Sequence, residues 1–119
     1  MGYVHEFGII KEIKENKEYD YNPRKYNCIS VNCDIIDSMY NGKFGEKINL
    51  LKTFAHTTSN PYKGLAYHGV TLIPVESLNL FLELIKNENE IINSKDLDKL
   101  IEKVTEAKEN NKWIIHYGL

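Results

Sequence analysis

Residues 64–85 read GLAYHGVTLIPVESLNLFLELI: an apolar extended run, a proline, and then an apolar helical pattern. The run Leu65–Ile73 is rich in β-branched and aromatic residues, which predicts a strand, and neither of its alternating faces is strongly polar. We therefore expect an interior strand that is covered on both faces. Pro74 cannot donate to the sheet ladder, and its fixed φ suits the first turn of the helix that follows.

Two longer helices are predicted in the second half of the chain. The first has a wide apolar stripe at helical spacing, formed by Leu78, Leu80, Phe81, Leu82, Leu84 and Ile85. The second is expected to begin after Ser94 as N-cap, and its apolar stripe is narrower: Leu97, Leu100, Ile101, Val104 and Ala107. The wide stripe needs a sheet on one side and another element on the other, so this helix forms the core.

Four further segments have strand-like patterns: 3–10, 26–31, 47–54 and 112–117. A short helix through Ile9, Ile10 and Ile13 competes with the first of them, and we favour the strand. A helix fits 47–54 about equally well, and we favour a strand that the loop 56–63 joins antiparallel to the central strand. A short helix is expected after Asp34 as N-cap, ending at Asn41-Gly42. The 119 residues are thus expected to form a single α+β domain. Its mainly antiparallel sheet would have about four to five strands, with the two longer helices packed on one face.

Charge and composition exclude several kinds of partner. The formal net charge is −2, the pI is near 6.1, and acidic and basic residues are interleaved, so we expect no nucleic-acid and no membrane partner. There is no apolar run of roughly 18 residues, and the first residues lack a secretory signal pattern. We therefore expect a cytoplasmic protein with reduced Cys28 and Cys33. The abundance of Lys, Asn, Ile and Tyr suggests a bacterial source.

No motif assigns a metal, a cofactor or a catalytic residue. Cys28 and Cys33 have four residues between them, and none of the four histidines pairs at zinc-ligand spacing. Neither cysteine has a local base, no serine lies in a Gly-x-Ser-x-Gly turn, and both nucleotide-binding glycine fingerprints are absent. Buried, reduced cysteines that act as small hydrophobic residues are the favoured interpretation.

Two polar features could bind a ligand or a partner. His68 follows Tyr67 on the central strand and precedes Gly69, which could leave room for an approaching group; a satisfied core histidine is the structural alternative. The loop 56–62 includes His56, Asn60 and Tyr62, which could contact a ligand or partner or could simply satisfy the turn backbone.

Eight tyrosines are the most unusual feature of the composition. Tyr19, Tyr21, Tyr40 and Tyr62 fall in predicted loops, where exposed rings would favour protein contacts. Packing around the rim of a small core is an equally weighted alternative.

The leading hypothesis is a non-catalytic protein-binding domain, in one form an immunity or antitoxin-like inhibitor of a bacterial toxin. The alternative is a small enzyme or ligand-binding protein that uses His68 with another histidine, a tyrosine or a cysteine in one pocket. A third hypothesis is a homodimer that pairs through an exposed sheet edge.

Overall fold

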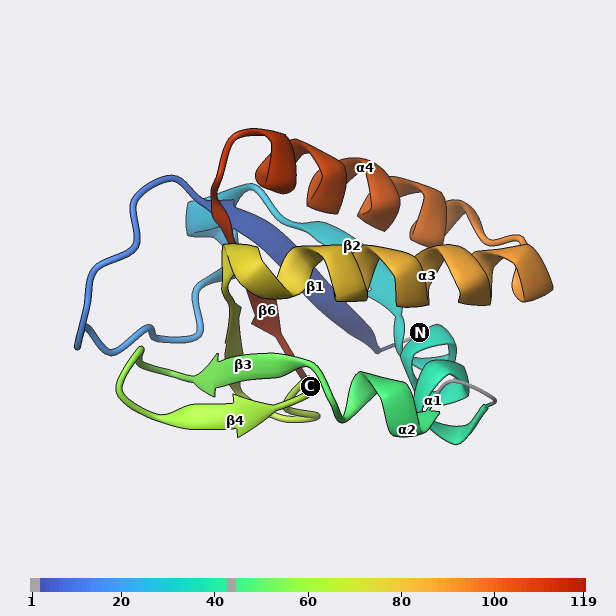
Figure 1. Cartoon of the computed structure of the whole chain (residues 1–119), viewed down its shortest axis with the longest axis horizontal. Helices are drawn as coiled ribbons and strands as arrows, with labels where there is room; N and C mark the ends of the chain where they lie inside the picture. Colours follow the sequence, from blue (N-terminus) through green and yellow to red (C-terminus); the bar gives the residue numbers. More distant parts are fainter. Residues whose placement is uncertain (1–2, 43–44) are drawn as a thin grey trace.

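The computed structural model describes residues 3–42 and 45–119 of the chain. Within these residues the strands are β1 (Val4–Ile10), β2 (Ile29–Asn32), β3 (Lys52–Ala55), β4 (Pro61–Lys63), β5 (Val70–Ile73) and β6 (Trp113–Tyr117). The helices are α1 (Cys33–Asn41), α2 (Gly45–Ile48), α3 (Leu78–Ile92) and α4 (Lys95–Glu109), with two short 3-10 helices, η1 (Pro23–Tyr26) and η2 (Val75–Ser77). Figure 1 shows their arrangement.

The six strands form one sheet in the order β2-β1-β6-β5-β3-β4, and every neighbouring pair is antiparallel. The predicted α+β class with a mainly antiparallel sheet is therefore confirmed. The sheet has more strands than the four to five expected, because the end of the loop 56–63 pairs with β3 as the short edge strand β4.

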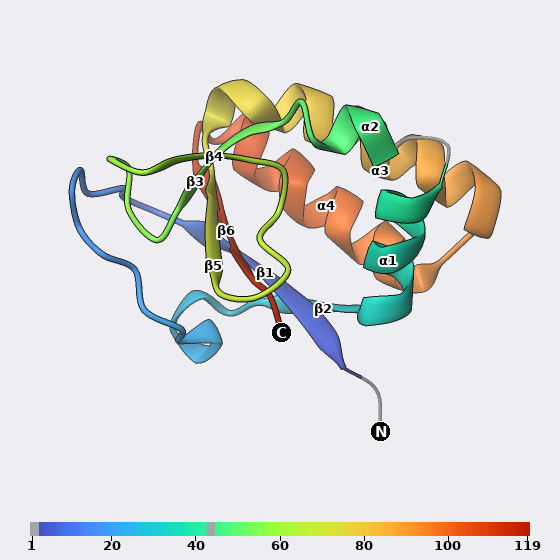
Figure 2. The same cartoon turned by 90° about the horizontal axis from the view of Figure 1, so that it is seen from below.

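The helices cover one face of the sheet, and an irregular segment covers the other (Figure 2). On the helical face, buried side chains of α3 and α4 pack against Phe7, Ile73 and Ile114 of the sheet. On the opposite face, a smaller cluster that includes Val70 and Tyr117 lies beneath the connection between β1 and β2. In the described part of the chain, no helix has both the length and the apolar character that a bilayer crossing requires.

The central strand is shorter than its composition predicts. β5 lies between β6 and β3 with all of its residues buried, as expected, but it begins at Val70 rather than at Leu65. Gly64 and Gly69 have φ of 72° and 94°, a left-handed conformation that interrupts a strand. Side chains also satisfy the backbone between these glycines: the Thr71 hydroxyl oxygen accepts the N–H of Ala66 at 2.8 Å.

Two other predicted strands have different boundaries. The ambiguous run Lys47–Phe54 is divided, because α2 ends at Ile48 and β3 begins at Lys52. Helix and strand patterns were both present in that run because a helix ends in it and a strand begins in it. The segment predicted to start a strand at Tyr26 first completes η1, and β2 begins at Ile29.

The helix boundaries follow from their caps. α3 continues beyond the exit expected at Lys86, as far as Asn93, whose φ of 50° ends the helix. The N-cap of α1 is Asn32 rather than Asp34, since the Asn32 side-chain oxygen accepts the backbone N–H of Asp34 at 2.8 Å. Ser94 caps α4 as predicted.

Candidate functional site

Two of the tyrosines predicted to bind a partner hold the fold together. Tyr19 is 3% exposed in the smaller core, and its hydroxyl accepts the backbone N–H of Lys14 at 3.0 Å. The Tyr40 hydroxyl is 2.6 Å from the backbone nitrogen of Leu65 and 2.8 Å from its carbonyl oxygen. It therefore accepts one hydrogen bond and donates the other, and it anchors the segment before β5.

The other three predicted tyrosines present their rings to solvent. Tyr21 is 55% exposed, Tyr62 43% and Tyr67 40%. They lie on three different segments: the connection between β1 and β2, the edge strand β4, and the loop before β5. Tyr21 also packs edge-on against Tyr117, with ring centroids 5.1 Å apart.

The predicted loop residues His56 and Asn60 both contact backbone carbonyl groups. The Asn60 side-chain amide donates to the carbonyl of Ala55 at 3.1 Å, and His56 Nδ1 lies 3.3 Å from the carbonyl oxygen of Tyr19. A Cβ at Gly69 would lie 3.0 Å from His56 Nε2, so the glycine does admit a close approach, as the sequence suggested.

His68 is exposed and stands at one side of a group of polar side chains. Its Nδ1 lies 3.1 Å from the carbonyl oxygen of Leu119, and its ring packs edge-on against Tyr67, with centroids 5.1 Å apart. His56 and His116 contact other residues, so the predicted combination of His68 with another histidine does not form by direct contact. His68 instead contacts the ring of Tyr67 and the backbone of Leu119.

Two fully buried histidines face each other on the helical side of the sheet. His5 Nδ1 and His116 Nε2 are 2.8 Å apart, and the rings stack with centroids 5.1 Å apart. His116 Nδ1 is 3.1 Å from the Thr71 hydroxyl, which in turn accepts the N–H of Ala66. Within the described residues, His5 Nε2 is the one buried side-chain nitrogen or oxygen that has no hydrogen-bond partner. We call His5, His116 and Thr71 the histidine relay.

Burial determines the charge of the relay. Removal from water lowers the pKa of His116 well below its ordinary value, and the proximity of His5 lowers it further. Burial also lowers the pKa of His5; the Asp37 carboxylate opposes this shift, and His68 adds to it. Both rings are therefore uncharged at neutral pH.

Tyr67 connects the relay to the surface and to α1. Its ring packs edge-on against His5, with centroids 5.5 Å apart. Its hydroxyl lies 3.2 Å from Cys33 Sγ and donates to Asp37 Oδ2 at 3.4 Å. The Cys33 thiol and the Asp37 carboxylate raise the pKa of Tyr67, so the phenol stays protonated.

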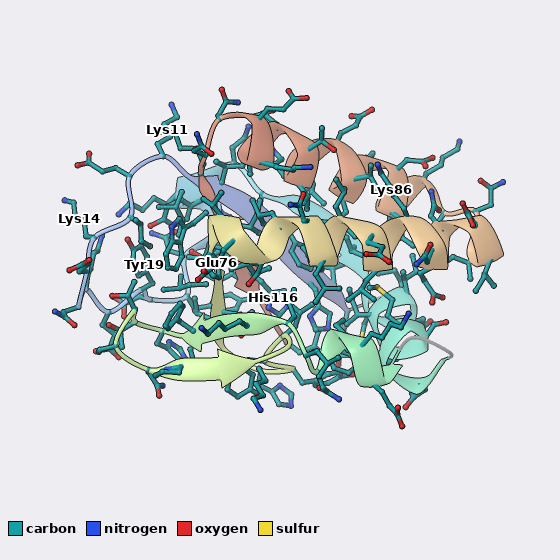
Figure 3. The ribbon with its side chains drawn as sticks, in the orientation of Figure 1. Lys11, Lys14, Tyr19, Glu76, Lys86 and His116 are labelled. Carbon is teal, nitrogen blue, oxygen red and sulfur yellow. The ribbon has the colours of Figure 1, made fainter. Side chains whose placement is uncertain are left out.

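A separate groove lies at the opposite end of β1. Its volume is about 990 Å³, and it is bounded by the segment after β1, by η1 and by the end of α4. Six lysines and two glutamates are among the lining residues. The lysines are Lys11, Lys14, Lys17, Lys25, Lys103 and Lys112. We call this the lysine groove; Figure 3 shows Lys11 and Lys14 projecting outward, whereas Tyr19 lies closer to the sheet.

Two ammonium groups of the lysine groove lie against aromatic rings. Lys17 Nζ lies 4.9 Å from the ring centroid of Tyr19, and Lys25 Nζ lies 5.6 Å from that of Tyr26. The Lys25 ammonium lowers the pKa of Lys17 because the two positive charges are close together, although Asp20 partly opposes the shift. An anion in this groove would relieve that repulsion.

A smaller hollow adjoins the groove across the segment 13–17. Its volume is about 340 Å³, and Phe54 and Trp113 form part of its wall with their rings stacked 5.6 Å apart. None of His5, His56, His68 or His116 lines either hollow.

Comparison of the chain with protein-family models, curated proteins and solved structures found no match. The geometry of these sites is therefore the basis for any functional argument. Among residues 3–42 and 45–119, no three His, Cys, Asp or Glu side chains are grouped so that they could hold a metal ion.

Sequence reasoning did not identify His5, Cys33, Asp37 or Thr71 as members of one group. His5 and His116 are 111 positions apart, and only the pairing of β1 with β6 brings them together. The alternation of β1 did place His5 on the same face as Phe7, which was the available signal. The lysine groove could not be predicted from the sequence for a related reason: its lysines come from distant segments, and each of these segments also contains acidic residues.

Proposed function

We propose that the chain is a non-catalytic protein-binding domain that receives an acidic segment of a partner protein in the lysine groove. The observation that carries the proposal is the separation of charge. The whole chain has 15 basic and 17 acidic residues. The groove is lined by six of those basic residues and by only two of the acidic residues. A positive groove on an acidic protein attracts a short run of carboxylates.

The character of the walls supports a peptide as the ligand. Tyr26, which is partly exposed, provides apolar area beside the ammonium group of Lys25, and the buried Tyr19 supports Lys17 from below. Tyrosines combine a large contact area with a low entropic cost, which suits protein recognition. The adjoining hollow with Phe54 and Trp113 would accept an apolar side chain next to the acidic run.

The acidic remainder of the surface disfavours nucleic acid. An extended polyanion would leave the groove and meet a surface where acidic residues outnumber basic ones. The same charge argument bears on the toxin-inhibitor form of the hypothesis. A nuclease toxin binds phosphates through a basic surface, which the groove would repel, so an inhibited target would have to present an acidic surface.

Fluorescence anisotropy with a labelled oligoglutamate peptide tests the proposal. Because Lys17 and Lys25 lie close together in the groove, reversing both charges (Lys17→Glu with Lys25→Glu) is expected to weaken binding by about tenfold or more. Reversing Lys86 and Lys95, which are exposed on α3 and at the start of α4, changes the net charge equally and serves as the control. Figure 3 shows Lys86 far from Lys11 and Lys14.

Three outcomes would contradict the proposal. The first is no detectable binding of the peptide at low salt, where charge attraction is strongest. The second is an equal loss of affinity in the groove pair and the control pair, which would indicate net charge rather than a site. The third is tighter binding of a single-stranded oligothymidine of equal charge, which would favour a nucleic-acid ligand.

A further inference from the structure

The hydrogen positions of the histidine relay limit how many protons it can hold. A neutral imidazole has one N–H and one acceptor nitrogen. His5 Nδ1 and His116 Nε2 are 2.8 Å apart, so one of them must carry a hydrogen and the other must not. Two tautomeric arrangements satisfy this condition. In one of them, His116 Nδ1–H donates to Thr71, His5 Nδ1–H donates to His116, and His5 Nε2 is a bare acceptor.

A first proton fits this arrangement without breaking a contact. It adds to His5 Nε2, the buried nitrogen that lacks a partner, and both hydrogen bonds of the relay remain. A second proton does not fit. His116 Nε2 would then carry a hydrogen facing the His5 Nδ1–H at 2.8 Å, with two positive charges in a fully buried site. The native geometry therefore accommodates one added proton.

The loop 65–69 lies against the relay and would respond to a disturbance of it. The Ala66 N–H depends on the Thr71 hydroxyl that also contacts His116, and the Tyr67 ring rests against His5. The carbonyl of Tyr67 accepts the N–H of Leu119 at 2.8 Å. Tyr67 is also 40% exposed, so movement of its ring alters the surface.

The groups around the relay come from every element packed against it. α1 contributes the carboxylate of Asp37, which favours protonation of His5, and the loop contributes His68, which opposes it. β5 contributes the uncharged Thr71 hydroxyl. On the remaining side, Phe7 packs on His116 with ring centroids 4.8 Å apart, and Phe81 of α3 lies behind Phe7. Among the described residues, Asp37 is the one carboxylate that shifts the pKa of either histidine, so two positive charges would be compensated only in part.

We propose that His5 and His116 form a proton-counting switch. With no or one added proton the loop 65–69 stays closed on the sheet, and a second proton separates the two rings and releases the loop. The transition is expected to be local, because Tyr40 keeps Leu65 anchored in the larger core, and the rest of the loop is held by hydrogen bonds to Thr71, Gly118 and Leu119. The inference does not depend on the lysine groove, which shares no residue with the relay.

Solution NMR between pH 7.5 and 4.5 tests the switch. The heteronuclear NOE of the amides of Ala66, Tyr67, Gly118 and Leu119 is expected to fall from values typical of rigid backbone to those of a flexible loop. The resonances of α3 should keep their positions. The ring ¹⁵N shifts of His5 and His116 report each proton separately, and the loop should open together with the second proton.

Substitutions distinguish the relay from its neighbours. His116→Gln and His5→Asn keep hydrogen-bonding groups but cannot take up a proton, so the acid response of the loop should disappear in both. His68→Gln is the matched control, because His68 lies on the loop outside the relay and contacts Leu119 instead. Its variant should still open with acid, at a slightly higher pH, because His68 opposes protonation of His5.

Five results would overturn the proposal. In the wild type, the first is a loop that stays rigid after both rings have taken up a proton. The second is the disappearance of the α3 resonances at the same pH as those of the loop, which would indicate global unfolding. In the variants they are a response that survives in either His116→Gln or His5→Asn, and one that disappears in His68→Gln. Should the relay variants fail to fold, the wild type still decides. A gap of more than about one pH unit between the second proton and the opening of the loop would refute the switch.

Discussion

The substitution Tyr40→Phe, which removes one hydroxyl group, should destabilise the protein more than Tyr62→Phe does. The Tyr40 hydroxyl bonds both the N–H and the C=O of Leu65, at 2.6 and 2.8 Å, and Leu65 is 4% exposed. Tyr40→Phe keeps the ring but leaves the buried N–H and C=O groups of Leu65 without the hydroxyl that bonds them. Burial also raises the pKa of Tyr40 to about 12, so the wild-type phenol can donate throughout the neutral range.

The expected cost follows from those two contacts. A typical hydrogen bond contributes about 1 kcal/mol, and a buried backbone group that is left without a partner costs about 1–3 kcal/mol. Since Tyr40 itself is half-buried, water can reach part of the vacated space. We therefore expect a loss of about 2–4 kcal/mol, which is a large fraction of the roughly 5–15 kcal/mol that stabilises a domain.

Urea unfolding followed by circular dichroism measures the effect, with Tyr62→Phe as the control. Tyr62 is 43% exposed on the edge strand β4, so loss of its hydroxyl should change the free energy of unfolding by less than about 0.5 kcal/mol. An equal effect of the two substitutions would refute the argument that Tyr40 anchors the segment before β5. If Tyr40→Phe changed how steeply the free energy of unfolding depends on urea concentration, an altered denatured state would be indicated instead.

Two further outcomes follow from the buried groups. Because the pKa values of His5 and His116 are lowered in the folded state, stability should be full above pH 6.5 and decline as the pH falls from 6.5 toward the folded pKa values. At pH 5 the loss in the free energy of unfolding is at most about 2 kcal/mol per histidine. Equal urea midpoints at pH 7.5 and pH 5 would contradict this expected loss. Gly118→Ala should cost about 1–3 kcal/mol, because its Cβ would lie 2.3 Å from the carbonyl oxygen of Tyr67. A thermal midpoint equal to that of the wild type would contradict this.

The sequence predicted the parts of the fold that depend on local patterns. The stripe from Leu78 to Ile85 implied a core helix, and this helix packs on the sheet because its apolar surface is wide. Ser94 was recognisable as a cap because its hydroxyl needs only the nearby N–H of Asp96. Such features require no knowledge of distant residues.

The features that the sequence missed depend on distant partners. Leu65 and Ala66 have strand-like neighbours, but Tyr40 and Thr71 take their backbone hydrogen bonds and keep them out of the ladder. A pattern read along the chain cannot weigh a tyrosine that lies 25 positions away against a neighbouring strand. The edge strand β4 was not predicted for a simpler reason. Pro61–Lys63 is short, exposed and begins with proline, which is typical of a loop and equally of an edge strand.

The two candidate sites lie at opposite ends of the same two central strands. β1 passes from His5 in the relay to Ile10 in the wall of the groove, and β6 runs back from the neighbourhood of Lys112 to His116. At about 3.3 Å per residue, this places the sites about 17 Å apart, beyond the range at which substitutions usually interact. Coupling between them would require β1 or β6 to shift, and both strands are held between two core clusters. The two proposals can therefore fail or succeed independently, and variants of one site are suitable controls for the other.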